Sequence, residues 1–331
     1  MTAPIIRLDD IKKNFVKSLD AAEKLVNLMG GKRREEIVHA VDGVSLEVEE
    51  GEVVGLVGES GCGKSTLGRI VAGIHSPSSG RLSYRGQAVN DLKGDEARSF
   101  QTKVQMIFQD PMSSLNPRFR VREIIGEAPR VHNLINAAEL DDYLDQLLLR
   151  VGLDPSYKRR YPHQFSGGQR QRIGIARALA VKPDFLVCDE AVAALDVSIQ
   201  AQVLNLFMEL RQDLGLTYLF ISHDLGVVEH LADRVAVMYL GRIVEMTRAD
   251  ALFEQPNHPY TQALLDEIPR IDKRKRRFQP IKGEIPSPLD PPSGCHFHPR
   301  CPKANDRCRL ERPVLKSIGD GHLSACHLND Q

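Results

Sequence analysis

Residues 58–66 constrain this chain more than any other segment, because they fit the pattern G-x-x-x-x-G-K-[ST]. An apolar run over residues 53–57 precedes them and predicts a buried parallel strand. A helix is predicted after them, with Leu67, Ile70 and Val71 on one face. Because this pattern binds phosphate when it joins a strand to a helix, we expect an α/β protein with a phosphate-binding loop.

The residue types of this loop suit a nucleotide. Glycines let backbone N–H groups close around phosphates, and the helix N-terminus adds positive potential. We expect Lys64 to supply a point charge to the β- and γ-phosphates, and Ser65 to offer its hydroxyl to Mg²⁺. Cys62 is interpreted as a small residue that fills space. The nucleotide-binding residues expected here are Gly58, Glu59, Ser60, Gly61, Cys62, Gly63, Lys64, Ser65 and Thr66.

Two adjacent acids end an apolar run at residues 185–190. We expect Asp189 at the end of a strand, where it would hold Mg²⁺, and Glu190 beside it as the general base that polarises the attacking water. Adjacent acids at a strand end are by themselves common surface residues. The phosphate loop upstream makes the catalytic interpretation the stronger one.

Residues 165–169 read Phe-Ser-Gly-Gly-Gln and open a predicted helix. This motif resembles the signature of the ABC ATPases, and the chain is similar to that family over residues 5–250. The resemblance implies that the signature binds the γ-phosphate of ATP held by an opposite subunit, and small residues at a helix N-terminus suit an anion. The alternative is a flexible Ser-Gly linker, which would not explain why the other motifs stand in the family's order. The residues concerned are Ser166, Gly167, Gly168 and Gln169.

The same resemblance assigns roles to four more residues. Gln109 matches the glutamine that contacts Mg²⁺ or the water and relays motion to a permease. His223 matches the switch histidine that holds the γ-phosphate, although a lone histidine of this kind is more often structural. Phe15 stands where the family stacks an aromatic ring on adenine, with a core phenylalanine as the alternative. Asp196 matches the last acid of the family's D-E-P-x-S-A-L-D stretch and is expected near the nucleotide.

One stretch departs from the family pattern. Where that pattern reads D-E-P-x-S-A-L-D, residues 189–196 read D-E-A-V-A-A-L-D, so Ala191 and Ala193 replace a proline and a serine. Glu190 and Asp196 remain, and hydrolysis is therefore still expected. Our hypothesis is that the missing serine hydroxyl weakens communication across a dimer of ATPase subunits.

The order of the predicted elements indicates an α/β fold, and the resemblance implies a P-loop NTPase core of ABC type. Strands predicted at residues 5–8, 41–48, 104–109, 185–188, 218–222 and 235–239 favour a parallel sheet with an antiparallel β region beside it. The mainly helical residues 112–180, including the run at 119–160, are expected to form an inserted subdomain. Residues 17–36 are interpreted as a charged loop or insertion. The nucleotide-binding domain is predicted over residues 1–254, followed at 255–331 by a proline-rich, irregular C-terminal region.

The C-terminal region narrows the resemblance. Residues 257–265, 283–288 and 291–295, together with residues 109–118, resemble the oligopeptide, dipeptide and nickel importer ATPases, and most of all the F-type ATPase of dipeptide systems. This resemblance covers nearly the whole chain and implies an ATPase that powers the uptake of dipeptides or oligopeptides. Nickel chelates, opines and heme remain alternative cargoes, because the permease and the binding protein select the substrate.

Four of the six cysteines follow the spacing C-x5-C-x6-C-x17-C; they are Cys295, Cys301, Cys308 and Cys326. Four thiolates suit either a tetrahedral zinc ion or an iron–sulfur cluster, and free thiols are a third alternative. The resemblance to the subfamily favours a [4Fe-4S] cluster with a structural role. Nearby histidines are alternative ligands, although each is expected to be exposed to solvent: His296, His298, His322 and His327.

Charge and hydropathy exclude several other classes. Lys plus Arg and Asp plus Glu are both 44, so the chain has no overall basic field for nucleic acid. The basic run at residues 273–277 is interpreted as a solvated linker, with contact to anionic lipid as the alternative. No run approaches the roughly 20 apolar residues of a membrane-spanning helix and no signal peptide is recognised, so the chain is expected to stay in the cytoplasm.

The resemblance also implies partners. We expect a second, non-identical ATPase subunit, two transmembrane permease subunits and an extracytoplasmic substrate-binding protein, with this chain peripheral on the cytoplasmic face of the inner membrane and no nucleic acid partner. The rival is a non-transport ABC ATPase acting on DNA or ribosomes; such proteins have tandem cassettes or long coiled coils, whereas this sequence has one signature and no extended heptad run. A catalytically inactive binding module is disfavoured by Glu190 and His223.

Overall fold

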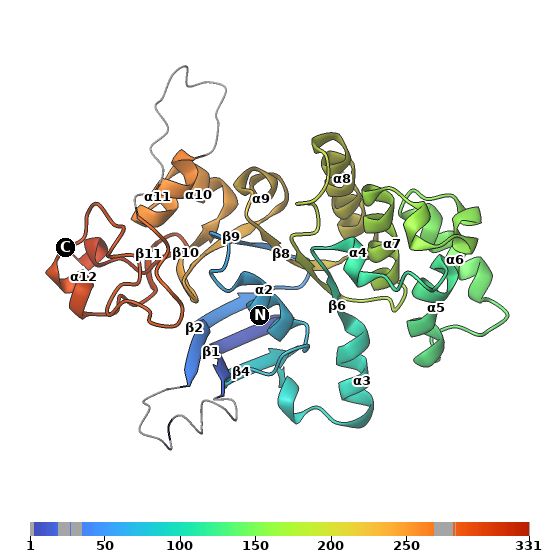
Figure 1. Ribbon diagram of the computed structural model, residues 1–331, viewed down its shortest axis with the longest axis horizontal. Coiled ribbons are helices and arrows are strands. Elements are labelled where there is room, and N and C mark those ends of the chain that lie inside the picture. Colours follow the sequence, from blue (N-terminus) through green and yellow to red (C-terminus); the bar gives the residue numbers. More distant parts are fainter. Residues whose placement is uncertain (1–2, 19–26, 28–34, 268–280, 282, 331) are drawn as a thin grey trace.

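The structure is a computed structural model that describes residues 3–18, 27, 35–267, 281 and 283–330. Among these residues, eight strands form one sheet in the order β11-β12-β10-β9-β3-β8-β7-β6, and four strands form a second sheet in the order β2-β1-β4-β5. Helices and strands alternate along much of the chain (Figure 1). The α/β fold predicted from the sequence is confirmed.

Five parallel strands form the centre of the larger sheet. They are β9 (Arg234–Tyr239), β3 (Val53–Val57), β8 (Thr217–Ser222), β7 (Phe185–Asp189) and β6 (Val104–Ile107), in that spatial order. Almost all of their residues are buried. Strands covered on both faces need apolar side chains on both, which explains why the sequence shows continuous apolar runs here and no alternation.

Three antiparallel strands extend this sheet beyond β9. Strand β10 (Arg242–Arg248) follows β9 through a tight turn and pairs with it. Strand β12 (His322–Ser324) then pairs with β10, and β11 (Lys316–Gly319) pairs with β12. The edge of the central sheet is therefore built from residues near the C-terminus.

The smaller sheet is antiparallel and lies beside the phosphate loop. It comprises β1 (Ile6–Lys17), β2 (Glu36–Val48), β4 (Ser79–Tyr84) and β5 (Gln87–Ala88). Its apolar side chains share one hydrophobic cluster with helix α2 (Lys64–Val71) and with one face of the parallel strands. Leu67, Ile70 and Val71 of α2 are fully buried in this cluster, as their helical spacing predicted.

The remaining helices divide into two groups. Helices α4 (Pro111–Ser114), α5 (Val121–Val131), α6 (Leu140–Arg150), α7 (Gly167–Leu179) and α8 (Val197–Leu214) lie at one end of the molecule in Figure 1. Helices α3 (Gly94–Lys103), α9 (Leu225–Leu231) and α10 (Ala249–Glu254) flank the sheets. The helical run predicted at 119–160 is not continuous, because residues 132–139 separate α5 from α6.

The C-terminal region lies at the opposite end from α5, α6 and α7 (Figure 1). It contains α11 (Pro259–Asp266), α12 (Asp306–Leu310) and the hairpin β11–β12. The domain boundary at residues 254 and 255 stays a prediction, although the hairpin belongs to the same sheet as the nucleotide-binding core. The basic run at 273–277 and most of the segment 17–36 lie outside the described residues.

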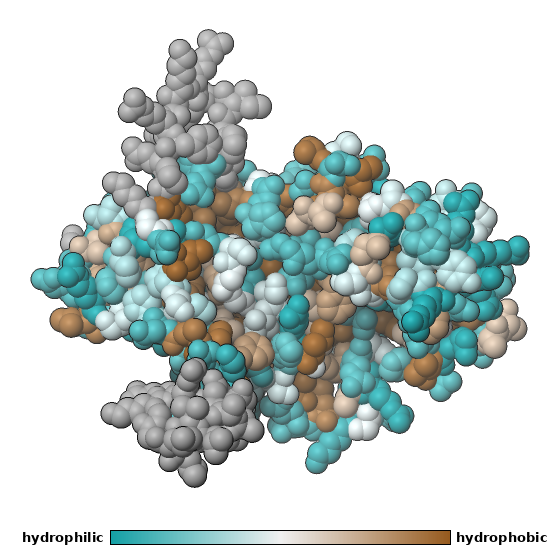
Figure 2. Space-filling model, in the orientation of Figure 1, coloured by the Kyte–Doolittle hydropathy of each residue, from teal (hydrophilic) through white to brown (hydrophobic). Residues whose placement is uncertain are grey.

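Figure 2 shows one face of the molecule, where hydrophilic residues cover most of the surface and hydrophobic residues lie in scattered groups. None of the helices in the described part of the chain has the length and apolar character needed to cross a membrane.

Candidate functional site

The phosphate loop connects the end of β3 to the start of α2, as the sequence predicted. Gly58 and Gly63 have φ of 151° and 107°, values that side chains with a Cβ rarely adopt. A Cβ on Gly58 would lie 2.1 Å from the carbonyl oxygen of Met238, and one on Gly63 would lie 2.1 Å from that of Ala40. These two positions accept only glycine, because the loop is packed tightly against neighbouring backbone.

Lys64 and Ser65 begin helix α2 and are held by short contacts. The Lys64 ammonium is buried and donates to the carbonyl oxygens of Gly58 at 2.6 Å and Glu59 at 3.0 Å. The Ser65 hydroxyl donates to Oδ1 of Asp189 at 2.8 Å. The structure therefore brings the predicted phosphate lysine and both predicted Mg²⁺ ligands of these two motifs to one place.

Asp189 is the last residue of β7 and is almost fully buried. Burial raises the pKa of its carboxyl group above the usual value, against the lowering effect of the hydrogen bond from Ser65. A hydroxyl and a carboxylate are hard oxygen donors, which are the ligands that Mg²⁺ prefers. The pair fits the metal that the sequence predicted.

Two of the predicted catalytic residues contact the carboxylate of Glu190. Gln109 Nε2 donates to Glu190 Oε2 at 2.7 Å, and His223 Nδ1 lies 3.3 Å from the same oxygen. Gln109 follows β6, Glu190 follows β7 and His223 follows β8, so the three residues come from neighbouring ends of parallel strands. Ligand sites of open α/β sheets lie at this carboxyl end of the strands.

The backbone of Glu190 is unusual. Its φ is +47°, a left-handed value that is uncommon for residues other than glycine. The backbone N–H donates to the carbonyl oxygen of Ile221 at 3.0 Å, which fixes Glu190 to strand β8. Backbone strain of this kind is found at functional sites, where the surrounding structure holds it in place.

The signature residues form the N-terminus of α7. Ser166 is the N-cap: its hydroxyl accepts from Gln169 N–H at 3.3 Å, and Gln169 Oε1 accepts from Ser166 N–H at 3.1 Å. A Cβ on Gly168 would lie 2.5 Å from Ile199 of α8, so α7 and α8 approach closely here. Gly167 starts the helix. The role of these four residues toward a second subunit stays a prediction.

Two further predicted residues lie on the surface. Asp196 is the exposed N-cap residue of α8. Phe15 is 39% exposed in β1, with His75 in an edge-to-face contact at 5.8 Å and the Lys13 ammonium 5.2 Å from its ring centre. An exposed phenylalanine with a cation beside it is available for stacking, whereas the alternative interpretation as a core residue does not describe it.

The two alanines of the divergent stretch differ in burial. Ala191 is 2% exposed and Ala193 is exposed. The position where the family pattern has a serine therefore faces outward, where a second subunit can reach it.

A third group of contacts to the phosphate loop comes from the C-terminal region and was missed from the sequence. The guanidinium of Arg300 donates two hydrogen bonds to the Glu59 carboxylate, of 2.6 and 2.9 Å. The backbone N–H of Glu59 donates to the Tyr260 hydroxyl at 2.9 Å. The only sequence signal for Arg300 is its position next to Cys301.

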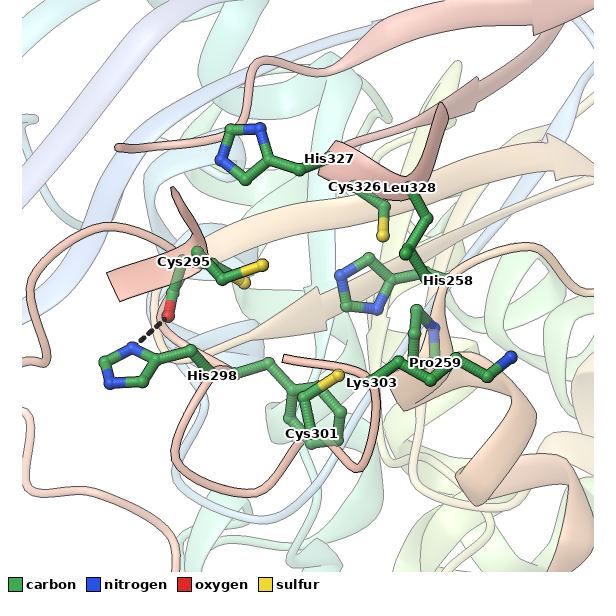
Figure 3. A pocket seen from close by; sticks show the side chains of 11 residues that line it. His258, Pro259, Cys295, His298, Cys301, Lys303, Cys326, His327 and Leu328 are labelled. Carbon is green, nitrogen blue, oxygen red and sulfur yellow. Dashed lines mark hydrogen bonds between the residues drawn. The ribbon is translucent and has the colours of Figure 1, made fainter. Parts of the chain in front are cut away.

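The four clustered cysteines line one pocket, together with His258, Pro259, Phe297, His298, Lys303, His327 and Leu328. Cys295, Cys301 and Cys326 point their sulfurs toward the middle of the pocket in Figure 3. Burial, together with the neighbouring thiols of Cys301, Cys308 and Cys326, raises the pKa of Cys295 to about 11. The structure thus gathers the cysteines that the sequence grouped.

The histidines behave differently from expectation. His296 and His327 are buried, contrary to the prediction of solvent exposure, because each bonds a backbone carbonyl: Leu240 at 3.0 Å and Glu311 at 2.9 Å. His298 and His327 point away from the middle of the pocket in Figure 3. His322 lies 2.7 Å from the buried carboxylate of Glu245. His258, which the sequence did not single out, points inward, and burial lowers its pKa to about 3.

Across the described residues, no group of three or more His, Cys, Asp or Glu side chains is arranged to hold a single metal ion. The metal at the cysteine pocket, which the sequence predicted as a [4Fe-4S] cluster with Zn²⁺ as the alternative, therefore stays a proposal.

Comparisons with known proteins agree with these motifs. The family model described as ABC transporter matches residues 41–193, and the model described as oligopeptide/dipeptide transporter, C-terminal region, matches residues 244–308. The chain is 26% identical to the ATP-binding cassette MJ0796, solved as a dimer bound to ADP and Pi. That match has a TM-score of 0.63 and covers 74% of this chain and 98% of the other.

Curated relatives match over almost their whole length. The chain is 49% identical over 328 residues to the oligopeptide transport ATP-binding protein AppF of Bacillus subtilis, covering 98% of this chain and 97% of AppF. It is 46% identical over 332 residues to the dipeptide transport ATP-binding protein DppF of Escherichia coli, covering 99% and 95%. The chain therefore belongs to the ATP-binding subunits of ABC transporters, in the family that carries the oligopeptide/dipeptide transporter C-terminal region.

Proposed function

We propose that this chain hydrolyses ATP to power the import of dipeptides or oligopeptides, as a peripheral subunit on the cytoplasmic face of the inner membrane. The observation that carries the proposal is the convergence of Gln109 and His223 on Glu190, beside the Ser65–Asp189 pair. Relatives with these names, oligopeptide and dipeptide transport ATP-binding proteins, support the substrate class.

Each residue of the site has a proposed part in hydrolysis. Glu190 accepts a proton from the attacking water, whose oxygen bonds to the γ-phosphorus as the bond to the β–γ bridging oxygen breaks. His223 and Gln109 orient that water and hold the γ-phosphate. Lys64 leaves the carbonyl oxygens of Gly58 and Glu59 and pairs with the phosphates, which are stronger partners for an ammonium.

Ser65 and Asp189 would hold Mg²⁺, with Gln109 as a further ligand. The ion neutralises phosphate charge when it is bound. Because the Ser65 hydroxyl already donates a hydrogen bond to Asp189, the two oxygens are close together, and an ion bound there would replace that hydrogen bond.

We propose that the signature residues Ser166, Gly167, Gly168 and Gln169 complete the site of a second ATPase subunit. The exposed N-terminus of α7 and the exposed Asp196 and Ala193 support this arrangement. MJ0796, the similar cassette, was solved as a dimer with ADP and Pi. The remaining partners proposed are a non-identical second ATPase, two transmembrane permeases and an extracytoplasmic binding protein.

We further propose that the cysteine pocket holds a [4Fe-4S] cluster. The fit rests on the donor set: four sulfurs from Cys295, Cys301, Cys308 and Cys326 line one pocket, and thiolates are the ligands of such clusters. A cluster of four irons is larger than one ion. Its four ligands are therefore farther apart than the ligands of a single metal ion. When bound, it would cross-link the segments that carry the four cysteines.

Purification of the tagged chain from solubilised membranes under anaerobic conditions tests the assembly. We expect two permeases, a second ATPase and a peptide-binding protein, and the binding protein identifies the cargo. Recovery with a binding protein for nickel chelates, opines or heme would replace the peptide assignment. Recovery with ribosomes or DNA-repair factors would overturn the importer assignment.

Iron and acid-labile sulfide analysis of the same sample tests the cluster. We expect iron and sulfide in equal amounts with the visible absorbance of an iron–sulfur chromophore, both lost in Cys308→Ser. One zinc per chain, or no metal at all, would contradict the cluster and leave the ATPase assignment intact.

A further inference from the structure

The segment between Cys295 and Cys301 lies directly against the phosphate loop. Its Arg300 is almost completely buried, with a side chain 4% exposed, and forms the bidentate pair with Glu59. The guanidinium also lies 5.9 Å from the ring centre of Tyr239 and 3.5 Å from its hydroxyl. A fork-shaped pair in a buried setting holds both partners in one geometry, more strongly than a surface ion pair does.

A second contact runs through aromatic rings. Phe297 is 1% exposed and packs against Tyr260 and Tyr239, with ring centres 5.3 and 5.2 Å apart. The Tyr260 hydroxyl accepts the hydrogen bond from Glu59 N–H. The position of Phe297, two residues after Cys295, therefore sets the position of the hydroxyl that holds the loop backbone.

A third path to the phosphate loop runs through Leu240 and Gly241, which follow β9. His296 Nδ1 donates to the Leu240 carbonyl oxygen at 3.0 Å, and the next residue, Gly241, donates its N–H to the Cys62 carbonyl oxygen at 2.8 Å. The Cys295–Cys301 segment thus reaches the phosphate loop directly through Arg300, and indirectly through Tyr260 and through Leu240 and Gly241.

These contacts matter for nucleotide binding because Glu59 is an acid within a loop that must accept polyanionic phosphates. Left unpaired, its carboxylate would repel them; paired with Arg300, its charge is neutralised. The Glu59 carbonyl oxygen also receives the Lys64 ammonium, so the backbone position of Glu59 affects where that lysine rests.

We propose that Arg300 is a positioning residue of the nucleotide site, and that the Cys295–Cys301 segment couples the cysteine pocket to the phosphate loop. Whatever fixes the sulfurs at the two ends of this segment also fixes Arg300, Phe297 and His296 against the loop. Coupling between two sites is reciprocal, so nucleotide in the loop protects the cysteine pocket, and an ordered pocket strengthens nucleotide binding. The proposed coupling rests on the proposed nucleotide function. It does not require the iron–sulfur cluster, which is one of the ways in which the cysteine pocket would be held in a fixed arrangement.

The first experiment measures Mg-ATP affinity of the full chain by calorimetry for Arg300→Met, Glu59→Gln and the double variant. Arg300→Met leaves the Glu59 charge unpaired, and we expect it to weaken binding by about tenfold or more. Glu59→Gln removes that charge, so the double variant should bind more tightly than Arg300→Met alone. Exposed Arg309 provides the matched control, Arg309→Met, with wild-type affinity expected.

Two results would overturn the positioning role. One is wild-type affinity in Arg300→Met. The other is a double variant that binds as weakly as Arg300→Met, since general damage to the fold is not repaired by removing the Glu59 charge. If Arg300→Met does not fold, Arg300→Lys keeps the charge but loses the fork; it should show a smaller loss, and wild-type affinity there would also reject the proposal.

The second experiment tests the coupling by the rate at which a chelator removes iron from the anaerobically purified chain. In the wild type a non-hydrolysable Mg-ATP analogue should slow this loss several-fold, and in Arg300→Met it should have little effect. Equal rates with and without nucleotide in the wild type would refute the coupling. If the purified chain carries no iron, the cluster proposal fails by itself, and alkylation of the four thiols replaces iron loss with the same two expected results.

Discussion

Gln109 donates a 2.7 Å hydrogen bond to Glu190, and this bond joins the end of β6 to the end of β7. The same carboxylate oxygen lies 3.3 Å from His223. The proposed base is therefore held by the two residues that would flank the attacking water.

Glu190→Gln is the direct test of the base. The amide cannot accept the proton from water, so we expect phosphate release to fall by about 100-fold or more while Mg-ATP binding is retained. The measurement is steady-state phosphate release together with calorimetric affinity, with exposed Glu139→Gln in the helical segment as the control. A loss below threefold, which is about 0.65 kcal/mol by the usual conversion, would assign the base to another group.

The divergent stretch gives a second prediction. In the double variant Ala191→Pro with Ala193→Ser, the restored hydroxyl stands at an exposed position, and we expect ATPase cooperativity between subunits to increase. The measurement is the dependence of ATPase rate on ATP concentration in the assembled transporter. An unchanged rate and unchanged cooperativity would reject the hypothesis that the alanines weaken communication.

We predict that replacing Glu245 by alanine greatly lowers the free energy of unfolding. It is fully buried in β10, and its two oxygens accept the N–H groups of Asn257 and His258, at 2.7 and 2.8 Å, while His322 lies 2.7 Å away. Glu245→Ala leaves these donors unsatisfied, and we expect it to lower the free energy of unfolding by about 3 kcal/mol.

Urea unfolding followed by circular dichroism measures that change. Glu245→Gln keeps the shape and one acceptor oxygen, and it should lose less. A loss below about 1 kcal/mol in the alanine variant would show that water replaces the carboxylate.

We predict that the ion pairs of Asp184 make the free energy of unfolding depend on pH. Burial alone would raise the pKa of this carboxyl, but Lys103 at 2.9 Å and Arg85 at 3.1 Å outweigh it and lower the pKa. The folded pKa lies below the unfolded value of about 3.9, so the stabilisation is complete above that value and is lost as the pH falls toward the folded pKa.

Asp184→Asn should therefore cost about 1 kcal/mol at neutral pH, and the difference from wild type should shrink as the pH falls below about 4. Urea unfolding at several pH values measures it, with Asp95→Asn as the control because that side chain is 98% exposed. A difference that grows on acidification would contradict the assigned direction.

The central strands could be predicted because burial on both faces demands continuous apolar runs, as in Val53–Val57. The phosphate loop, Gln109, the Asp189–Glu190 pair and His223 could be recognised because each follows such a strand. The signature follows no strand and could be recognised only by its resemblance to the family motif. The strands β11 and β12 could not, since they have four and three residues and lack an alternating pattern. They form only because β10 offers an edge with which to pair.

The contact between Arg300 and Glu59 lay beyond prediction for a different reason. The two residues are 241 positions apart, and no local pattern links a basic residue in a cysteine-rich segment to an acid in a glycine-rich loop. Such a pair depends on the docking of the whole C-terminal region, which packs Phe297 against both Tyr239 and Tyr260. The sequence showed both sites but not the contact between them.

The hairpin β11–β12 has a consequence for how the chain is made. Strand β10 is complete long before β12 leaves the ribosome, so during synthesis its outer backbone groups remain open to any other extended chain. A nascent or truncated chain without residues 316–324 would expose an adhesive edge and tend to self-associate. The strands β11 and β12 thus cover the edge of β10, and we expect a chain truncated before them to give less soluble protein.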